Sequence, residues 1–220
     1  MKLKDELDRI SLEAKKSLSP EDALIVEKAI ADVTGLNLVT KAVYTNDSAP
    51  EFVLPSHDGR MVSLHKTLEK KPVILLFYRG GWCPYCSVTL RAYELAYERI
   101  LAAGGELLAV SPENPDHRTL TVENNRLMFP VLSDIENNAA KAFRLLYEVP
   151  SMLANLMKRN NIDLAKINGS PEWVLPIPGV YVLNKRRLVV AASLDADHRK
   201  RMEPEQALEY LEQRAFTGIG

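Results

Sequence analysis

The sequence predicts an α/β domain built on a mainly parallel or mixed sheet. From Lys71 onward, apolar segments with the composition of strands alternate with segments of helical periodicity, which is the pattern of this class. The apolar run of residues 107–110 has no polar alternation, as expected for a central strand covered on both faces. Ahead of this region, two short strand candidates flank an Asp-Gly turn and predict a hairpin.

Composition limits the partners of the protein. The chain has 220 residues, with 29 acidic and 28 basic side chains, so no overall field attracts nucleic acid or an anionic membrane. The first residues lack the continuous apolar run of a signal peptide, and no later segment approaches the ~18 apolar residues of a membrane span. We therefore predict a cytoplasmic protein whose partners are small molecules or protein thiols.

Residues 1–45 are predicted to form a helical extension ahead of one domain, residues 46–220. Two helices are expected in the extension, and Ser19 and Pro20 are predicted to cap and begin the second, which ends near Gly35. The apolar stripes of the two helices are Leu3, Leu7, Ile10, Ala14 and Leu18, then Val26, Ala29, Ile30 and Val33. These helices suggest a packing or dimerisation role.

The domain itself is predicted element by element from residue 52. The hairpin strands lie at residues 52–54 and 61–64, on either side of the turn at Asp58 and Gly59. Further strands are expected at residues 73–78, 106–111, 129–132, 180–183 and 188–193. Helices are expected after Cys83, at about 116–125 and 136–147, in an inserted segment at 152–158, and at 204–214.

The two cysteines of the chain, Cys83 and Cys86, form a Cys-x-x-Cys pair between a predicted strand and a predicted helix. This junction places both sulfurs at a helix N-terminus, where unpaired N–H groups and the helix dipole stabilise a negative charge. Pro84 suits the first helical position. Cys-x-x-Cys thiols in such places have pKa values as low as about 3.5 to 7.5, so the pair is expected to be redox-active.

The order of several motifs resembles the peroxiredoxin-like branch of the alkyl hydroperoxide reductase and thiol-specific antioxidant family, over about residues 48–215. The motifs are residues 52–54, the Asp58-Gly59 turn, the RGGWCPYC run, residues 109–112, residues 129–134 and the final hairpin and helix. The resemblance implies a thioredoxin-like fold with a central mixed sheet of four or five strands, helices on both faces and an extra hairpin.

The resemblance also implies roles for particular residues. Aligned with the family pattern Pro-x-x-x-Thr-x-x-Cys, Cys86 is the peroxide-attacking cysteine, while Arg79 and Cys83 replace the proline and the threonine. Cys83 then becomes the resolving thiol. Arg201 stands where the family has its active-site arginine, and Pro178 resembles the cis-proline that faces the cysteines in thioredoxins.

The implied activity is thiol-dependent reduction of hydrogen peroxide or organic hydroperoxides, with no cofactor and no metal. A sulfenic acid forms on the attacking cysteine and is captured by the second thiol as a disulfide. An external thiol, from a thioredoxin or glutathione system, would reduce that disulfide. Arg79, Trp82, Pro84, Tyr85 and Pro178 are predicted to line the substrate pocket, and the resemblance suggests a homodimer.

Other interpretations of the same residues stay open. In a thioredoxin- or glutaredoxin-like thiol-disulfide oxidoreductase, Cys83 would be the nucleophile, and Trp82 before it supports that role. The pair could also belong to a non-enzymatic redox sensor, to an inert structural pair or to half of a zinc site, although no second cysteine pair is present. Arg201 has an alternative role as an ion-pair partner of Asp195 or Asp197.

Two further expectations concern less informative parts of the chain. The single histidines, His57, His65, His117 and His198, are expected at the surface or at helix caps, with His117 the only one of interest. The inserted segment, residues 148–173, precedes Pro178 in the chain, and we expect it to gate the pocket.

Overall fold

The computed structural model describes residues 2–214, so Met1 and residues 215–220 of the predicted ranges lie outside the description. Five strands form the central sheet in the order β5-β4-β3-β8-β9: Val131–Ser133 (β5), Glu106–Ser111 (β4), Val73–Phe77 (β3), Gly179–Leu183 (β8) and Val189–Leu194 (β9). Strand β3 pairs in parallel with β4 and antiparallel with β8. The sheet is therefore mixed, as predicted.

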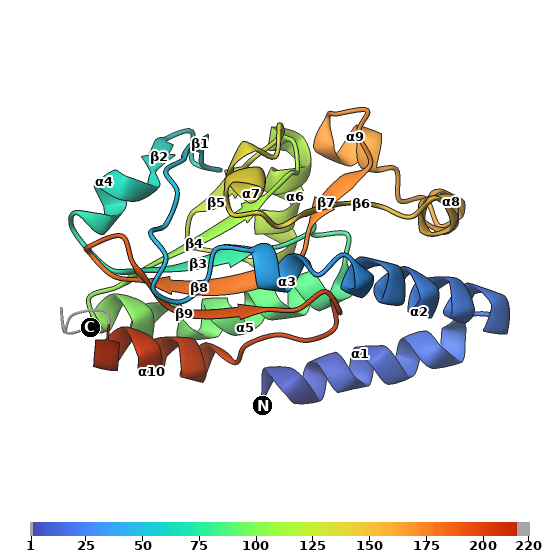
Figure 1. The fold of residues 1–220 in the computed structure, drawn as a ribbon, viewed down its shortest axis with the longest axis horizontal. Coiled ribbons are helices and arrows are strands. Elements are labelled where there is room, and N and C mark those ends of the chain that lie inside the picture. The colour runs from blue at the N-terminus through green and yellow to red at the C-terminus, as the bar shows by residue number, and fades with distance from the viewer. Residues whose placement is uncertain (1, 215–220) are drawn as a thin grey trace.

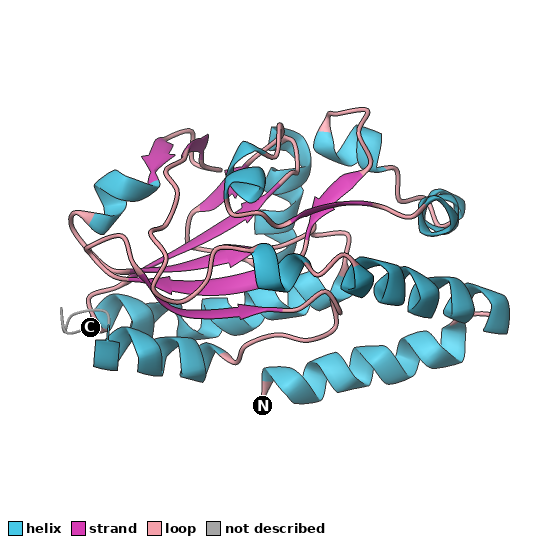
Figure 2. Ribbon diagram, viewed as in Figure 1, coloured by secondary structure: helices cyan, strands magenta, loops and turns pink. Residues whose placement is uncertain are grey.

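Helices cover both faces of the sheet (Figures 1 and 2). On one face, α5 (Pro84–Ala102) and α10 (Pro204–Arg214) pack on Ile74 and Leu76 of β3. On the other face, Val73, Leu75 and Phe77 of the same strand meet α4 (Leu64–Leu68) and α7 (Asn138–Ala142). Because both sides of β3 are buried, its sequence is continuously apolar.

The N-terminal region forms two helices as predicted, α1 (Leu3–Ser17) and α2 (Pro20–Gly35), followed by the short α3 (Leu38–Lys41). The Ser19 side chain caps α2 by accepting a hydrogen bond from the Asp22 N–H. Leu3, Leu7 and Ile10 are buried in the core against α5. The extension therefore shares the hydrophobic core of the following domain.

The hairpin is also confirmed: β1 (Val53–Pro55) pairs antiparallel with β2 (Met61–Ser63). Helix α6 (Pro115–Asn125) lies beside β5. The inserted segment contains the expected helix, α8 (Ser151–Arg159), and a second one, α9 (Leu164–Asn168), that was not predicted.

The long helix predicted at residues 136–147 is wrong beyond α7. Arg144 has a φ of 59°, which ends the helix, and β6 (Leu146–Glu148) follows and pairs antiparallel with β7 (Val174–Pro176). Leu145, Tyr147 and Val149 are buried while Glu148 between them is exposed. This alternation is typical of a strand, but the pairing that stabilises it comes from residues some 30 positions away in the chain.

Within residues 2–214, no helix is long and apolar enough to cross a bilayer.

Candidate active site

The Cys-x-x-Cys pair lies where the sequence predicts it, between β3 and α5. Cys83 is the N-cap residue of α5, Pro84 is its first residue, and Cys86 lies within its first turn. The free N–H groups and the positive end of the helix dipole therefore point toward the two sulfurs. Both cysteines are free thiols and buried, with Cys83 1% exposed and Cys86 0% exposed.

The loop before the pair requires its two glycines. Gly80 has a φ of +146°, in a region that side-chain-bearing residues avoid. A Cβ on Gly81 would collide with the Thr121 side chain of α6, and a Cβ on Gly80 would collide with the Trp82 ring. The glycines thus allow the loop to pass close to α6 and to fix Trp82 over the site.

Glu113, which the sequence did not indicate, fixes this loop through hydrogen bonds to its carboxylate. Its carboxylate accepts hydrogen bonds from the Gly81 N–H (2.9 Å) and from the hydroxyls of Tyr78 (2.9 Å), Ser111 (3.1 Å) and Thr121 (2.9 Å). Burial raises the pKa of Glu113, and the four donated hydrogen bonds oppose that shift. Each carboxylate oxygen accepts two of the four bonds, so its acceptor capacity is used fully.

We expect Glu113→Gln to destabilise the protein. An amide replaces one acceptor oxygen by an NH2 donor that faces two of the four donors, which leaves buried groups unpaired and costs about 1–3 kcal/mol in the free energy of unfolding. Urea unfolding measures the change. Glu123→Gln, an exposed position on α6, is the matched control and should shift the midpoint little. An equal loss in both variants would show that Glu113 does not hold the loop.

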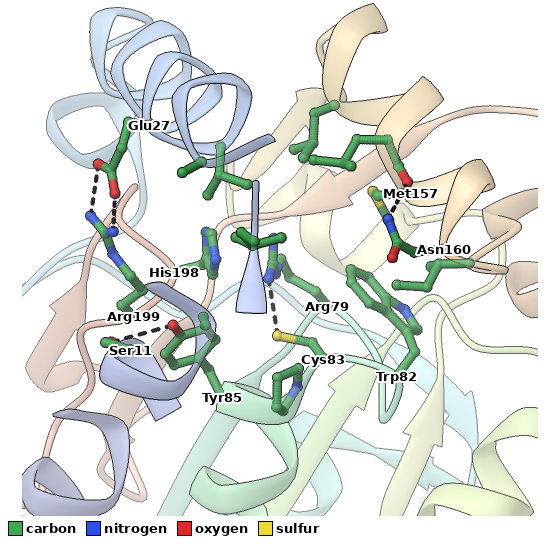
Figure 3. A pocket seen from close by; sticks show the side chains of 18 of the residues that line it. Ser11, Glu27, Arg79, Trp82, Cys83, Tyr85, Met157, Asn160, His198 and Arg199 are labelled. Carbon is green, nitrogen blue, oxygen red and sulfur yellow. Dashed lines mark hydrogen bonds and ion pairs between the residues drawn. The ribbon is translucent and has the colours of Figure 1, made fainter. Parts of the chain in front are cut away.

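Arg79 is the cation closest to Cys83. Its Nη2 donates a hydrogen bond to the Cys83 Sγ over 3.0 Å, although the side chain is only 5% exposed. The guanidinium lies over the Trp82 ring, 5.1 Å from the centroid, and is hydrogen-bonded to the hydroxyl of Tyr147 on β6. The unpredicted strand β6 therefore helps to place Arg79. Figure 3 shows the Arg79 side chain directed at the Cys83 sulfur.

The two sulfurs differ in acidity. Burial alone would raise the pKa of Cys83, but a hydrogen bond from the Cys86 thiol and the charges of Arg79 and Arg201 outweigh it and hold that pKa well below its usual value. Burial, together with the hydrogen bond to Cys83 and the charge on Cys83, raises the pKa of Cys86 well above its usual value. Of the two thiols, Cys83 is therefore the more acidic.

Arg201 lies at the second sulfur, in the half-buried loop before α10. Its Nη2 is 3.7 Å from the Cys86 Sγ. The alternative ion-pair role does not apply, because Asp195 pairs with Lys200 (3.2 Å) and Asp197 pairs with Arg199 (2.8 Å). Each sulfur of the pair thus has its own arginine.

A cavity of 310 Å³ opens over Cys83. Of the predicted pocket residues, Arg79, Trp82, Pro84 and Tyr85 line it. The remaining wall is mostly apolar, and its apolar part comes mainly from α1 with its C-cap residue, from α2 and from α8: Ala14, Leu18, Ala23, Val26, Leu153, Leu156 and Met157. Cys86 and Arg201 do not line this cavity; they lie beyond Cys83, at a separate void of only 10 Å³. A small molecule in the cavity therefore meets Cys83 first.

The structure places Pro178 and His198 differently from the expectations. Every peptide bond in residues 2–214 is trans, so Pro178, which is buried directly before β8, is not the cis-proline that the resemblance implies. His198 is not a surface or cap residue: it lines the cavity and stacks edge-on against Tyr85, with ring centroids 5.4 Å apart. Burial and the charges of Arg79, Arg201 and Arg199 hold the pKa of His198 well below its usual value.

No group of three or more metal-ligating side chains of the types His, Cys, Asp or Glu gathers anywhere within residues 2–214.

Comparison with known proteins identifies the family. Residues 45–192 match the AhpC/TSA family. The chain belongs to this family. It is 32% identical over 147 residues to peroxiredoxin Q, chloroplastic, from Oryza sativa subsp. japonica, and the aligned region covers 66% of this chain and 65% of the rice protein. It is 31% identical over 105 residues to peroxiredoxin Q, chloroplastic, from Populus jackii, and the aligned region covers 48% of this chain and 49% of that protein.

The match with the AhpC/TSA family confirms the resemblance found in the sequence, although the chain spans about half to two thirds of the length of these curated relatives. The fold comparison agrees with the assignment. The crystal structure of peroxidoxin BcpB from Mycobacterium tuberculosis superposes with a TM-score of 0.59 at 19% identity, covering 77% of this chain and 96% of that one. The thioredoxin-like fold of this branch is thereby shown. Helices α1 and α2 lie outside the matched range, yet they supply part of the cavity wall over Cys83.

Proposed function

We propose that the protein is a thiol peroxidase in which Cys83 attacks the peroxide and Cys86 resolves the product. The observation that carries this proposal is the Cys83 sulfur itself, which faces the cavity with a lowered pKa and a hydrogen bond from Arg79. The order of attack is the reverse of the one that the family alignment implies. This reversed order is favoured because Cys86 is buried beyond Cys83, away from the cavity, and has a raised pKa.

The reaction follows from this arrangement. The Cys83 thiolate attacks one peroxide oxygen, the O–O bond breaks, and the other oxygen leaves as hydroxide or alkoxide and takes a proton from water. Arg79 and the N–H groups of α5 stabilise the negative charge that develops on the departing oxygen. The Cys86 thiol then attacks the sulfur of the Cys83 sulfenic acid, loses its proton and releases water, which leaves a disulfide. Arg201 stabilises Cys86 as it becomes a thiolate.

Single-turnover stopped-flow with hydrogen peroxide and with cumene hydroperoxide tests the proposal, with the fluorescence of Trp82 and Trp173 as the signal. We expect each chain to consume one peroxide, to lose two thiols and to gain one disulfide, with a rate constant at least about 100-fold above that of free cysteine. A rate no faster than free cysteine with both peroxides would refute the peroxidase function.

The second candidate is a thiol-disulfide oxidoreductase, which uses the same low-pKa Cys83. Trp82 directly before the pair supports it, whereas the 1% exposure of Cys83 opposes it, because a protein disulfide must reach the sulfur. Reduction of insulin disulfides, measured beside peroxide consumption, separates the two candidates. The cytoplasmic location, the homodimer and the gating role of residues 148–173 stay predictions.

A further inference from the structure

We propose that a low-molecular-weight thiol, not a protein dithiol, reduces the oxidised Cys83–Cys86 pair. This inference rests on the peroxidase function proposed above, and it concerns the second half of the same catalytic cycle. It follows from how the sulfurs are covered, from what holds the cover in place and from the size of the space beneath it.

The first step of the argument is access. Cys83 is 1% exposed and Cys86 0% exposed, and only Cys83 lines the 310 Å³ cavity. A thiol that attacks a disulfide must bring its sulfur into contact with one of the two disulfide sulfurs. Even a transient redox encounter between proteins buries up to about 1,200 Å² of surface in total. Here residues of α1, α2 and α8 line the cavity around Cys83 (Figure 3), so a protein partner would have to displace them to reach the sulfur.

The second step is that α1 is anchored firmly. Its residues Leu3, Leu7 and Ile10 are 3%, 5% and 9% exposed and pack in the main core. The Ser11 and Tyr85 hydroxyls, 3.3 Å apart, join α1 directly to the start of α5. Moving α1 away from the cavity would expose these apolar core side chains to water, which is unfavourable.

The third step concerns the rest of the cover. Helix α2 is joined to α8 by the ion pair between Asp22 and Arg159 (2.6 Å) and to the loop after β9 by the pair between Glu27 and Arg199 (2.5 Å). Val33 of α2 is buried in the core on the face of the sheet that α4 and α7 cover. Exposed ion pairs contribute little by themselves, but they link α2 to two elements that line the same cavity. The cover is therefore a packed part of the fold.

The fourth step is the fit. A cavity of 310 Å³ is at the lower end of the range of small-molecule sites, about 300–1,000 Å³. Its wall is mostly apolar, so it suits the carbon skeleton of a small organic thiol. Two such molecules acting in turn supply the two electrons that the disulfide needs.

The chemistry balances with this reductant. The first thiol, as a thiolate, attacks the Cys83 sulfur, the Cys83–Cys86 bond breaks, and Cys86 leaves as a thiolate beside Arg201 and then takes a proton. A mixed disulfide remains on Cys83. The second thiolate attacks the outer sulfur of that mixed disulfide and releases the small disulfide, so that Cys83 leaves as the thiolate that Arg79 stabilises.

The test compares reductants on protein that has been oxidised with diamide, so the reduction step is measured whether or not peroxide can oxidise the pair. The loss of the Cys83–Cys86 disulfide is followed by acid quench, thiol labelling and mass spectrometry, with 2-mercaptoethanol, with glutathione and with reduced thioredoxin at equal thiol concentrations. We expect the small thiols to reduce the protein at least about tenfold faster than thioredoxin does. Faster reduction by thioredoxin would overturn the proposal while leaving the peroxidase function intact.

Cavity variants give an independent check. Ala23→Phe, or Ala14→Leu if the first variant fails to fold, fills the cavity and should slow reduction by both small thiols about tenfold. Leu24→Phe and Leu12→Phe are the matched controls, since these neighbouring side chains are 69% and 55% exposed, and they should leave the rate unchanged. Equal rates in a folded cavity variant and its control would also overturn the proposal.

Discussion

Cys83→Ser is expected to abolish rapid reaction with peroxide, and Cys86→Ser is expected to react and stop at a sulfenic acid. The reason is that Cys83 lines the cavity and has a lowered pKa, while Cys86 lies at a separate small void and has a raised pKa. Serine at position 83 removes the nucleophile, so the single-turnover rate constant should fall by at least about 1,000-fold. In Cys86→Ser no second thiol is available to resolve the sulfenic acid.

Stopped-flow fluorescence measures the rates, and dimedone labelling followed by mass spectrometry locates the sulfenic acid. The two variants are matched controls for each other, because each keeps one thiol of the same motif. Dimedone on Cys83 of the Cys86→Ser protein supports the proposed order. Rapid reaction of Cys83→Ser with labelling on Cys86 would instead restore the order that the family alignment implies.

Arg79→Met should lower the peroxide rate constant at pH 7 by about 100-fold. Arg79 is the charged group in hydrogen-bond contact with the Cys83 sulfur, at 3.0 Å, and its charge lowers the pKa of Cys83. Without that charge, burial raises the pKa of the thiol, so little thiolate forms at neutral pH, and the departing oxygen also loses its closest cation.

The pH profile separates this effect from general damage. In the wild type the pKa of Cys83 is depressed, so the rate should stay constant as the pH falls through the ordinary thiol range and decline only near the lower pKa. In Arg79→Met the rate should climb with pH through and above that ordinary range. Arg118→Met is the control, because Arg118 is equally buried but bonds to the Pro55 carbonyl and the Ser133 hydroxyl. An unchanged profile in Arg79→Met would show that Arg79 does not set the acidity of Cys83.

Much of the fold could be predicted from the sequence because the patterns that indicate its helices and strands are local. The apolar run of β3, Pro84 at the start of α5 and the Ser19 cap each act within a few residues, so each could be identified without tertiary information. The strand β6 could not be identified from the sequence. Its residues follow a short helix and become a strand because residues 174–176 pair with them, and a nearby alternation of three buried residues was too short a signal to outweigh the helical pattern.

The site shows the same division. The Cys-x-x-Cys spacing and the helix start were predicted from the residues, and Arg201 was predicted from the family resemblance. In the structure the Arg201 Nη2 lies 3.7 Å from the Cys86 Sγ. Glu113 and His198 were not assigned to the site, because nothing in their local sequence marks a buried carboxylate that accepts four hydrogen bonds or a histidine directed into a cavity. Their positions depend on contacts with Gly81, Thr121 and Tyr85.

By itself, the sequence determined the family, the alternation of strands and helices, and the presence of two thiols at a helix N-terminus. Only the tertiary structure decided which thiol is the acidic one that meets the cavity. That difference arises because two chemically identical side chains, three residues apart and equally buried, have different nearest arginines and different access to the cavity. Acidity and access are properties of the folded surroundings: Arg79 and Arg201 lower the pKa of Cys83, and helices α1, α2 and α8 shape the cavity through which it is reached.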